Sequence, residues 1–291
     1  MNDAADSSLG LWTRATTVLS QTVLISALLY YFGWVRTQAT WSHFGIDTRL
    51  LGYDTADYAL RSINSAFLPL VGGGLAALGA TALHRTILAP AARATPSTRR
   101  HRLANATIVV ARVGGFLLIA VVVTGLLLPV AVGNALGVAL PLSLLGAACL
   151  LSYADHLHAC GQRPDRRVPP KTPGLRRLLL IGLALVGLLW SIALYAQATG
   201  QDVARSIAAG LRTRPSVTLY SVERLAVTGP GITVETLDLD GSKYHFRYTG
   251  LVSLTQTSER YVLVAASWRK GRDAVYIVPA GDNLRIDITT R

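Results

Sequence analysis

The sequence predicts an α-helical membrane bundle of five transmembrane helices, followed by a small antiparallel all-β domain that forms a sandwich or a partly open barrel. Three observations predict this fold: five long apolar runs, two arginine-rich loops between them, and a polar tail with alternating apolar residues. Of the 291 residues, 51% are hydrophobic and only 15% are charged. Soluble domains usually carry about 25% charged residues, so the composition indicates an integral membrane protein.

Each apolar run is long enough to cross a bilayer. A helix needs about 20 predominantly apolar residues to cross about 30 Å of hydrocarbon, and lipid offers the backbone no hydrogen-bond partner, which favours helices. The predicted spans are residues 17–34, 63–83, 108–128, 132–153 and 178–198. Together they form a transmembrane domain over residues 16–198, preceded by an N-terminal tail over residues 1–15.

The basic residues predict the orientation. The net charge is +12, and much of it lies in loops 84–105 and 155–177 between predicted spans. Positive loops stay on the cytoplasmic side, so we expect the N-terminus inside, loop 36–62 outside and the C-terminus outside. Because this charge sits in membrane loops, we expect no nucleic-acid partner. Arginine greatly outnumbers lysine, which indicates a GC-rich bacterial genome and therefore a multi-pass protein of the bacterial cytoplasmic (inner) membrane.

Small residues in the spans have two interpretations. Gly72, Gly73 and Gly74 in the second span favour close packing of another helix, whereas the alternative is a broken helix beside a conduction path. Gly133-x-x-x-Gly137 is a packing motif of the same kind, for contacts within the chain or in a homo-oligomer.

Arg112 is the one charge clearly inside a span, and intramembrane charges are functional candidates. We favour a side chain that extends to the nearby cytoplasmic surface.

The external loop 36–62 is rich in aromatic residues typical of a membrane interface. Asp47 is predicted to cap a short helix over residues 48–51, and Asp54 or Thr55 a second helix that leads into the second span. We interpret the loop as a structural lid over the bundle, with a docking surface or a vestibule as the alternative. Its interaction candidates are Trp41, Phe44, Asp47, Tyr58 and Arg61.

The C-terminal part changes its hydrophobic period. In residues 199–215, Val203, Ile207 and Leu211 recur every four residues, which predicts an amphipathic linker helix. From 216 to 291 the period is two, and Asp240-Gly241 is typical of a hairpin turn. We therefore expect six or seven short strands in an extracytoplasmic β domain.

No catalytic motif is found in the sequence. It lacks Gly-x-Ser-x-Gly, His-Glu-x-x-His and the phosphate-binding Gly-x-x-x-x-Gly-Lys-Ser/Thr. His156, His158 and Cys160 are weak candidates for a zinc or copper site, but a second ligand pair is missing, which favours a polar cluster at the interface. We therefore predict no cofactor and a protein that is not an enzyme.

Six stretches carry a resemblance to other proteins, namely residues 31–36, 44–47, 57–62, 219–221, 248–251 and 260–263. In these stretches the chain resembles a group of actinobacterial polytopic membrane proteins with a small C-terminal β domain. The resemblance implies a helical bundle with a small tail domain, and it supplies no catalytic residue to carry over.

These observations predict a non-enzymatic membrane protein whose β domain binds a partner or senses an envelope condition. Its expected partners are the lipid bilayer, a second copy of the chain and an envelope protein. The alternative is an oligomeric channel or transport component, with a conduction path near Gly72–Gly74 and the first external loop.

Overall fold

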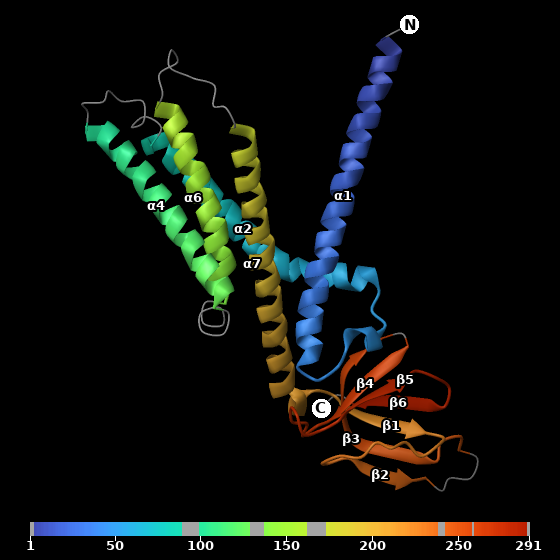
Figure 1. The fold of residues 1–291 in the computed structure, drawn as a ribbon. Coiled ribbons are helices and arrows are strands. Elements are labelled where there is room, and N and C mark those ends of the chain that lie inside the picture. Colours follow the sequence, from blue (N-terminus) through green and yellow to red (C-terminus); the bar gives the residue numbers. More distant parts are fainter. Residues whose placement is uncertain are drawn as a thin grey trace. The chain divides into compact units, whose positions relative to one another are not determined.

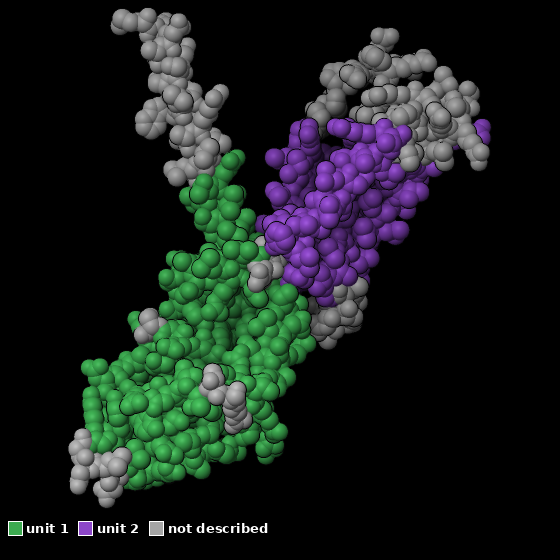
Figure 2. All heavy atoms as spheres, turned by 180° about the vertical axis from the view of Figure 1, so that it is seen from behind, with its two compact units in different colours: residues 1–65, 196–291 green, residues 66–195 purple. Residues whose placement is uncertain are grey.

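The computed structural model describes residues 3–88, 99–128, 137–161, 173–237, 242–257 and 259–289. The chain divides into two compact units, shown in green and purple in Figure 2. Unit 1 contains residues 1–65 and 196–291, and unit 2 contains residues 66–195. The helices are α1 (Asp3–Ser42), α2 (Thr55–Leu83), α4 (Arg99–Leu127), α6 (Ala139–Gly161) and α7 (Pro173–Ala209), with short helical turns η1 (Thr48–Leu51), η2 (His84–Leu88) and η5 (Leu211–Thr213).

Four stretches within these helices are long and apolar enough to cross a membrane. They are Phe67–Thr86, Asn105–Leu127, Ala139–His158 and Gly174–Ala209. The fifth predicted span, residues 17–34, lies within α1 and is not among these four. Helix α1 begins at Asp3 and continues without a break to Ser42, so the residues predicted as a tail are helical from Asp3.

Two helices differ from their predicted limits. Helix α6 begins at Ala139 rather than at residue 132, because Gly137 has a φ of 44° and therefore precedes the helix. At the other end, α6 continues to Gly161 into the predicted loop 155–177. Helix α7 joins the last predicted span and the predicted linker helix in one piece, because residues 198–203 keep the helical backbone through Gly200.

The helices of unit 2 pack closely at small residues. A Cβ added at Gly115 would fall 2.8 Å from the Leu151 side chain, and one at Gly187 would fall 2.7 Å from the Leu145 backbone nitrogen. Glycine therefore lets α6 approach both α4 and α7, as is typical of membrane helices.

Residues 216–289 form one antiparallel sheet of six strands (Figure 1). The strands are β1 (Ser216–Ser221), β2 (Thr233–Thr236), β3 (Phe246–Gln256), β4 (Arg260–Ala265), β5 (Val275–Pro279) and β6 (Leu284–Thr289). Their order is β5-β4-β3-β1-β6, and β2 also pairs with β3. The described strands thus form a single sheet, and the predicted packing of two sheets face to face is not found among them. The predicted turn at Asp240-Gly241 lies outside the described residues.

The long central strand β3 pairs with two strands, β2 and β4, along one of its edges. Residues Phe246–Thr249 pair with β2, and Leu251–Gln256 pair with β4. Gly250 lies between these segments with a φ of 83°, a conformation that only glycine adopts readily. A Cβ there would also overlap the carbonyl group of Gly231. This residue therefore allows β3 to pass from one neighbour to the other.

One face of the sheet is closed by the loop between β1 and β2. Its core comprises Val217, Leu219, Val227, Tyr248, Leu251, Leu263 and Val278. The Tyr248 side chain is fully buried, and its hydroxyl accepts from the Leu225 nitrogen at 2.6 Å and donates to the Leu225 carbonyl at 3.2 Å. The Tyr276 hydroxyl donates to the Thr228 carbonyl. Two tyrosines thus hold the loop against the sheet.

Candidate functional site

The segment between α1 and α2, residues 43–54, is a tightly bonded elbow. The Asp47 carboxylate accepts from the Arg49 nitrogen at 3.0 Å and caps η1, and Gly52 ends this turn in a left-handed conformation. Asp54 accepts from the Asp57 nitrogen at 2.7 Å at the start of α2. The predicted caps at Asp47 and Asp54 are therefore confirmed. These short polar side chains satisfy backbone groups that the helix starts leave unpaired.

The elbow packs on the second face of the sheet. Trp41, Phe44, Ile46 and Leu51 share a core with Ala204 and Leu211 from the end of α7 and with Val252, Leu254, Val262, Val264 and Trp268 from the sheet domain. The Phe44 and Trp268 rings lie 4.9 Å apart. Trp41 and Phe44 belong to this core, and Tyr58 is also buried, so these three interaction candidates do not form an exposed docking surface. The loop is thus part of the β domain.

Two glycines bring the helix ends of unit 1 together. A Cβ at Gly33 would overlap the Tyr58 carbonyl, where α1 meets the first turns of α2. A Cβ at Gly200 would fall 2.9 Å from the Ala39 Cβ and closer still to the Arg36 carbonyl oxygen. The Thr40 hydroxyl donates to the Gly200 carbonyl at 3.1 Å. Helices α1, α2 and α7 are therefore joined where they meet the sheet domain.

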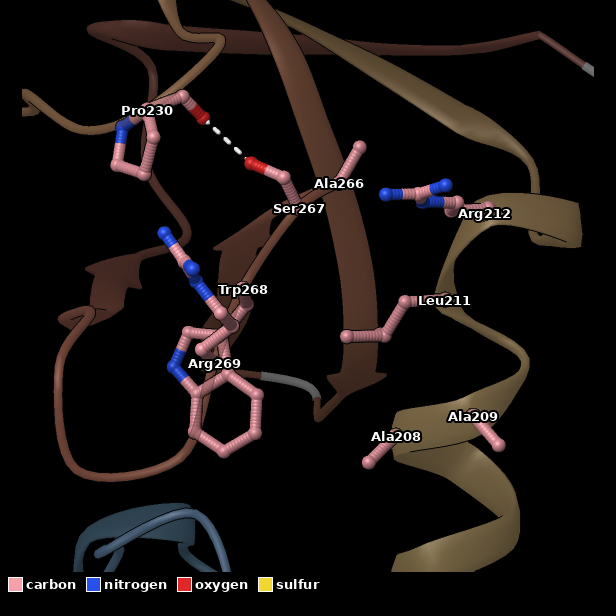
Figure 3. A pocket seen from close by; sticks show the side chains of 9 residues that line it. All are labelled: Ala208, Ala209, Leu211, Arg212, Pro230, Ala266, Ser267, Trp268 and Arg269. Carbon is pink, nitrogen blue, oxygen red and sulfur yellow. Dashed lines mark hydrogen bonds between the residues drawn. The ribbon is translucent and has the colours of Figure 1, made fainter.

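A basic cleft of about 480 Å³ lies beside this core (Figure 3). Its wall is formed by Ala208, Ala209, Leu211, Arg212, Pro230, Ala266, Ser267, Trp268 and Arg269. The Ser267 hydroxyl donates to the Pro230 carbonyl at 2.8 Å, which joins two sides of the cleft. The Trp268 nitrogen donates to the Asp273 carbonyl at 3.0 Å. Two guanidinium groups and a framework of hydrogen bonds make this cleft suited to an anionic group.

The neighbourhood of the cleft is electropositive. His43 in the elbow lies beside Trp268, and its Nδ1 is 3.4 Å from the Lys270 ammonium group. Burial lowers the pKa of His43, and the positive charges of Lys270 and Arg205 lower that pKa further. Neutral His43 is thus favoured by the charges around it.

A second cavity, of about 260 Å³, lies where α1, α2 and α7 meet β3. We call it the arginine cavity, and its lining residues are Arg36, Thr37, Thr40, Trp41, Arg61, Val203, Ile207, Leu254 and Thr255. One Arg36 nitrogen donates to the Arg61 carbonyl at 2.8 Å. The Arg61 guanidinium lies over the Tyr53 ring, 4.3 Å from its centroid, a cation–π geometry that fixes the charge.

Two buried polar atoms of this cavity wall have no hydrogen-bond partner among the described residues. They are the Thr37 hydroxyl and the Trp41 indole nitrogen. Thr37 is 2% exposed and Trp41 is 3% exposed. A buried polar group without a partner costs about 1–3 kcal/mol, so an acceptor that reaches either atom would stabilise the protein.

The helix that contains Gly72, Gly73 and Gly74 is not broken at these residues. Gly72, Gly73 and Gly74 lie within continuous α2, and a Cβ at any of them would meet no described atom within 4 Å. Gly137 precedes α6, so it does not lie on the helix face that the packing motif requires. Gly133 lies outside the described residues.

Arg112 belongs to an ion-pair network in unit 2. It lies 3.8 Å from the Asp155 carboxylate, which also pairs with Arg176 at 3.1 Å. The sequence predicts Asp155 at the start of loop 155–177, whereas in the structure it lies within α6. Helix α6 extends far enough to present that carboxylate to both arginines.

The weak metal candidates lie near the same end of α6. The His156 ring lies 5.1 Å from that of His84, whose Nδ1 is 3.0 Å from the Tyr153 hydroxyl. In the described part of the chain, no three His, Cys, Asp or Glu side chains are placed to hold a metal ion. The Cys160 side chain lies outside the described part, so a site formed by His156, His158 and Cys160 stays a prediction.

Among the residues that line the two cavities, the sequence indicates only Trp41 and Arg61 as interaction candidates, and it indicates Val203, Ile207 and Leu211 only as the apolar stripe of a linker helix. Arg212 and Arg269 come from segments 57 residues apart, and Arg36 meets Arg61 only through the bend of the elbow. The chain is a helical protein with four candidate spans, and its β domain is formed by the sheet together with the elbow. No protein-family model, curated protein or solved structure matches the chain. Its function is therefore inferred from the fold and its two cavities.

Proposed function

We propose that this chain is a non-enzymatic integral membrane protein of the bacterial inner membrane, whose extracytoplasmic β domain binds an acidic partner at the basic cleft. The observation that carries the proposal is the shared core of the elbow, the end of α7 and the sheet. This core joins the cleft to the ends of α1 and α7. A partner bound there would bias the arrangement of those helix ends, which is what a sensor requires.

The topology supports a common side for the elbow and the sheet. The two share a core, so they lie on the same side of a membrane, and four candidate spans separate them along the chain. An even number of crossings returns the chain to its starting side. With the basic loops 84–105 and 155–177 in the cytoplasm, that side is the external one, and residues 17–34 supply a fifth crossing.

Paired fusions at Arg291 test this orientation. Alkaline phosphatase activity without fluorescence of a green fluorescent protein fusion is the expected result. Fluorescence without phosphatase activity would place the sheet in the cytoplasm and overturn the envelope role.

The chemistry of the cleft defines the partner. Arg212 and Arg269 line it, and Lys270 lies close by against His43. Guanidinium groups form their strongest hydrogen bonds with carboxylates and phosphates. The partner therefore presents one of these groups, and its binding weakens as salt screens exposed charges.

Site-specific photo-crosslinking in cells tests the cleft. A benzoylphenylalanine in place of exposed Pro230 keeps the carbonyl that Ser267 uses. We expect an adduct that weakens in high salt and is lost with Arg269→Gln, but persists with Arg285→Gln, which removes a charge on β6. An adduct that is indifferent to Arg269→Gln would contradict binding at the cleft.

The channel alternative depends on α2. The second span presents Gly72–Gly74 with no described atom near them, so a conduction path there needs a helix from a second copy. Liposomes that contain the protein would then pass ions or small solutes, and Gly73→Leu would change that flux. Sealed liposomes would exclude this function and leave partner binding unaffected.

A further inference from the structure

We infer that the arginine cavity is a binding site for a phosphate group, and that this phosphate is the headgroup of an anionic phospholipid. The inference is independent of the partner proposed for the basic cleft. It rests on two guanidinium groups, two buried donors without partners, and the position of the cavity at the ends of membrane helices.

The donor set matches a phosphate group. Arg36 and Arg61 supply charged donors, and Thr37 and Trp41 supply a hydroxyl and an indole N–H that no described residue accepts. No described carboxylate forms a salt bridge with Arg61, whose charge is instead held over Tyr53. Phosphate oxygens accept from all of these groups, and charged donors bind them most strongly.

The remaining wall favours a lipid over a free ion. Val203, Ile207 and Leu254 form an apolar side of the cavity, which suits the glycerol carbons next to a headgroup. A volume of about 260 Å³ is below the ~300–1,000 Å³ of pockets that enclose drug-sized molecules. The cavity therefore fits a headgroup whose acyl chains stay outside.

The surroundings place the cavity at headgroup depth. The exposed aromatic side chains of Tyr30, Tyr31 and Trp34 lie two to six residues before Arg36 on α1. Such aromatic belts sit at the membrane–water interface. On α2, Arg61 precedes the candidate span that begins at Phe67. Both arginines thus lie just outside the apolar segments, where lipid phosphates are found.

Thr37→Val separates a ligand role from a packing role. Valine has nearly the same shape as threonine but lacks the hydroxyl. Without ligand, the variant is expected to unfold at a higher temperature than wild type, because a buried donor without a partner has been removed. With ligand, it is expected to bind about threefold or more weakly, because a hydrogen bond is lost. A purely structural threonine would not show this opposite pair of effects.

The test uses the full chain in a maltoside detergent, which contains no phosphate. Native mass spectrometry and thermal unfolding are measured with dioctanoyl phosphatidylglycerol, with dioctanoylglycerol, and with inorganic phosphate. We expect stoichiometric binding and stabilisation by phosphatidylglycerol but not by dioctanoylglycerol. Arg61→Gln should weaken binding about tenfold or more, whereas Arg49→Gln, on the exposed side of the elbow, should not.

Each outcome decides the inference. Stabilisation by inorganic phosphate as strong as that by phosphatidylglycerol would support the phosphate site but assign it to a soluble ligand. Equal binding of phosphatidylglycerol and dioctanoylglycerol would overturn the site. Unchanged phosphatidylglycerol binding by Thr37→Val would also overturn it, and this variant keeps the test valid if Arg61→Gln does not fold.

Discussion

The Thr40 hydroxyl donates a hydrogen bond of 3.1 Å to the carbonyl oxygen of Gly200, 160 residues further along the chain. Thr40 lies at the end of α1, and Gly200 lies on α7 where it approaches the sheet. The contact requires close backbones, because a Cβ at Gly200 would collide with the Arg36 carbonyl. Gly200 therefore lets the ends of α1 and α7 approach each other closely.

Gly200→Ala is predicted to destabilise the protein. Alanine gains up to about 1 kcal/mol over glycine in a helix, but the added methyl group would force α1 and α7 apart, and overpacking costs about 1–3 kcal/mol. Gly182→Ala, on the same helix with no described atom within 4 Å of its Cβ, should be neutral or stabilising. Unfolding midpoints in detergent compare the two variants. A Gly200→Ala midpoint equal to that of Gly182→Ala would show that the helices do not approach at this residue.

Tyr248→Phe is predicted to destabilise the β domain by about 1–3 kcal/mol, the range for an unpaired buried polar group. The Tyr248 hydroxyl forms hydrogen bonds with both the nitrogen and the carbonyl oxygen of Leu225. Removing the hydroxyl would leave both backbone groups without this partner. The loop over the sheet should also become more accessible to protease. Tyr244→Phe is the matched control, because that tyrosine is partly exposed. Equal protease resistance of both variants would contradict the role of Tyr248.

The sequence predicted the local elements better than their contacts. The caps at Asp47 and Asp54 follow from capping residues, and the antiparallel strands of the tail follow from a period of two. The elbow–sheet core follows from pairings such as Phe44 with Trp268, which lie more than 200 residues apart. The hydrophobic period of a single helix or strand carries no information about contacts between residues so far apart in the sequence.

One local signal did indicate the hidden contact. Residues Tyr261–Ala265 form a continuous apolar run, and such a strand is typically buried on both faces. In the structure, Leu263 faces the core closed by Tyr248, while Val262 and Val264 face the elbow. The alternation of Tyr261 and Leu263 accounts for one face only. The apolar residues between them therefore required a second covering element.

The cavities were less predictable than the fold. Arg61 is an interaction candidate of the external loop in the sequence, but nothing local pairs it with Arg36. The structure uses Asp47 and Asp54 as helix caps, and it places both arginines in one cavity wall. Both carboxylates thus bond backbone N–H groups, and no described carboxylate forms a salt bridge with Arg61.

The stability of unit 1 is predicted to fall as the pH decreases below about 6.5, the ordinary pKa of histidine. The folded pKa of His43 is lowered by burial and by Lys270 and Arg205, so the unfolded chain takes up a proton first. The contribution is complete above the unfolded pKa and is lost as the pH falls towards the folded pKa. Unfolding midpoints between pH 5 and pH 8, values about one to two units either side of that pKa, should depend less on pH in His43→Gln.

Lys270→Gln provides the control for this effect. It removes one charge that lowers the His43 pKa, while burial and Arg205 remain. Its pH dependence should therefore lie between those of wild type and His43→Gln. A His43→Gln profile that is parallel to the wild-type profile would assign the pH dependence to other groups.

A segment of residues 210–289 produced alone is predicted to aggregate or to unfold, although it contains every strand. Without the elbow, Val252, Leu254, Val262 and Val264 would lose their cover of Trp41, Phe44, Ile46 and Leu51. Burial of each such side chain contributes about 1.5–3 kcal/mol, and a small domain has a net stability of only about 5–15 kcal/mol. Circular dichroism and size-exclusion chromatography measure the outcome.

Adding residues 36–62 through a flexible linker should improve folding, whereas adding the same residues with Phe44→Asp should not, because the charge would enter the core beside Trp268. A monomeric, cooperatively folded 210–289 segment would instead make the sheet an independent domain, and the elbow would then be a docked loop that does not determine its fold.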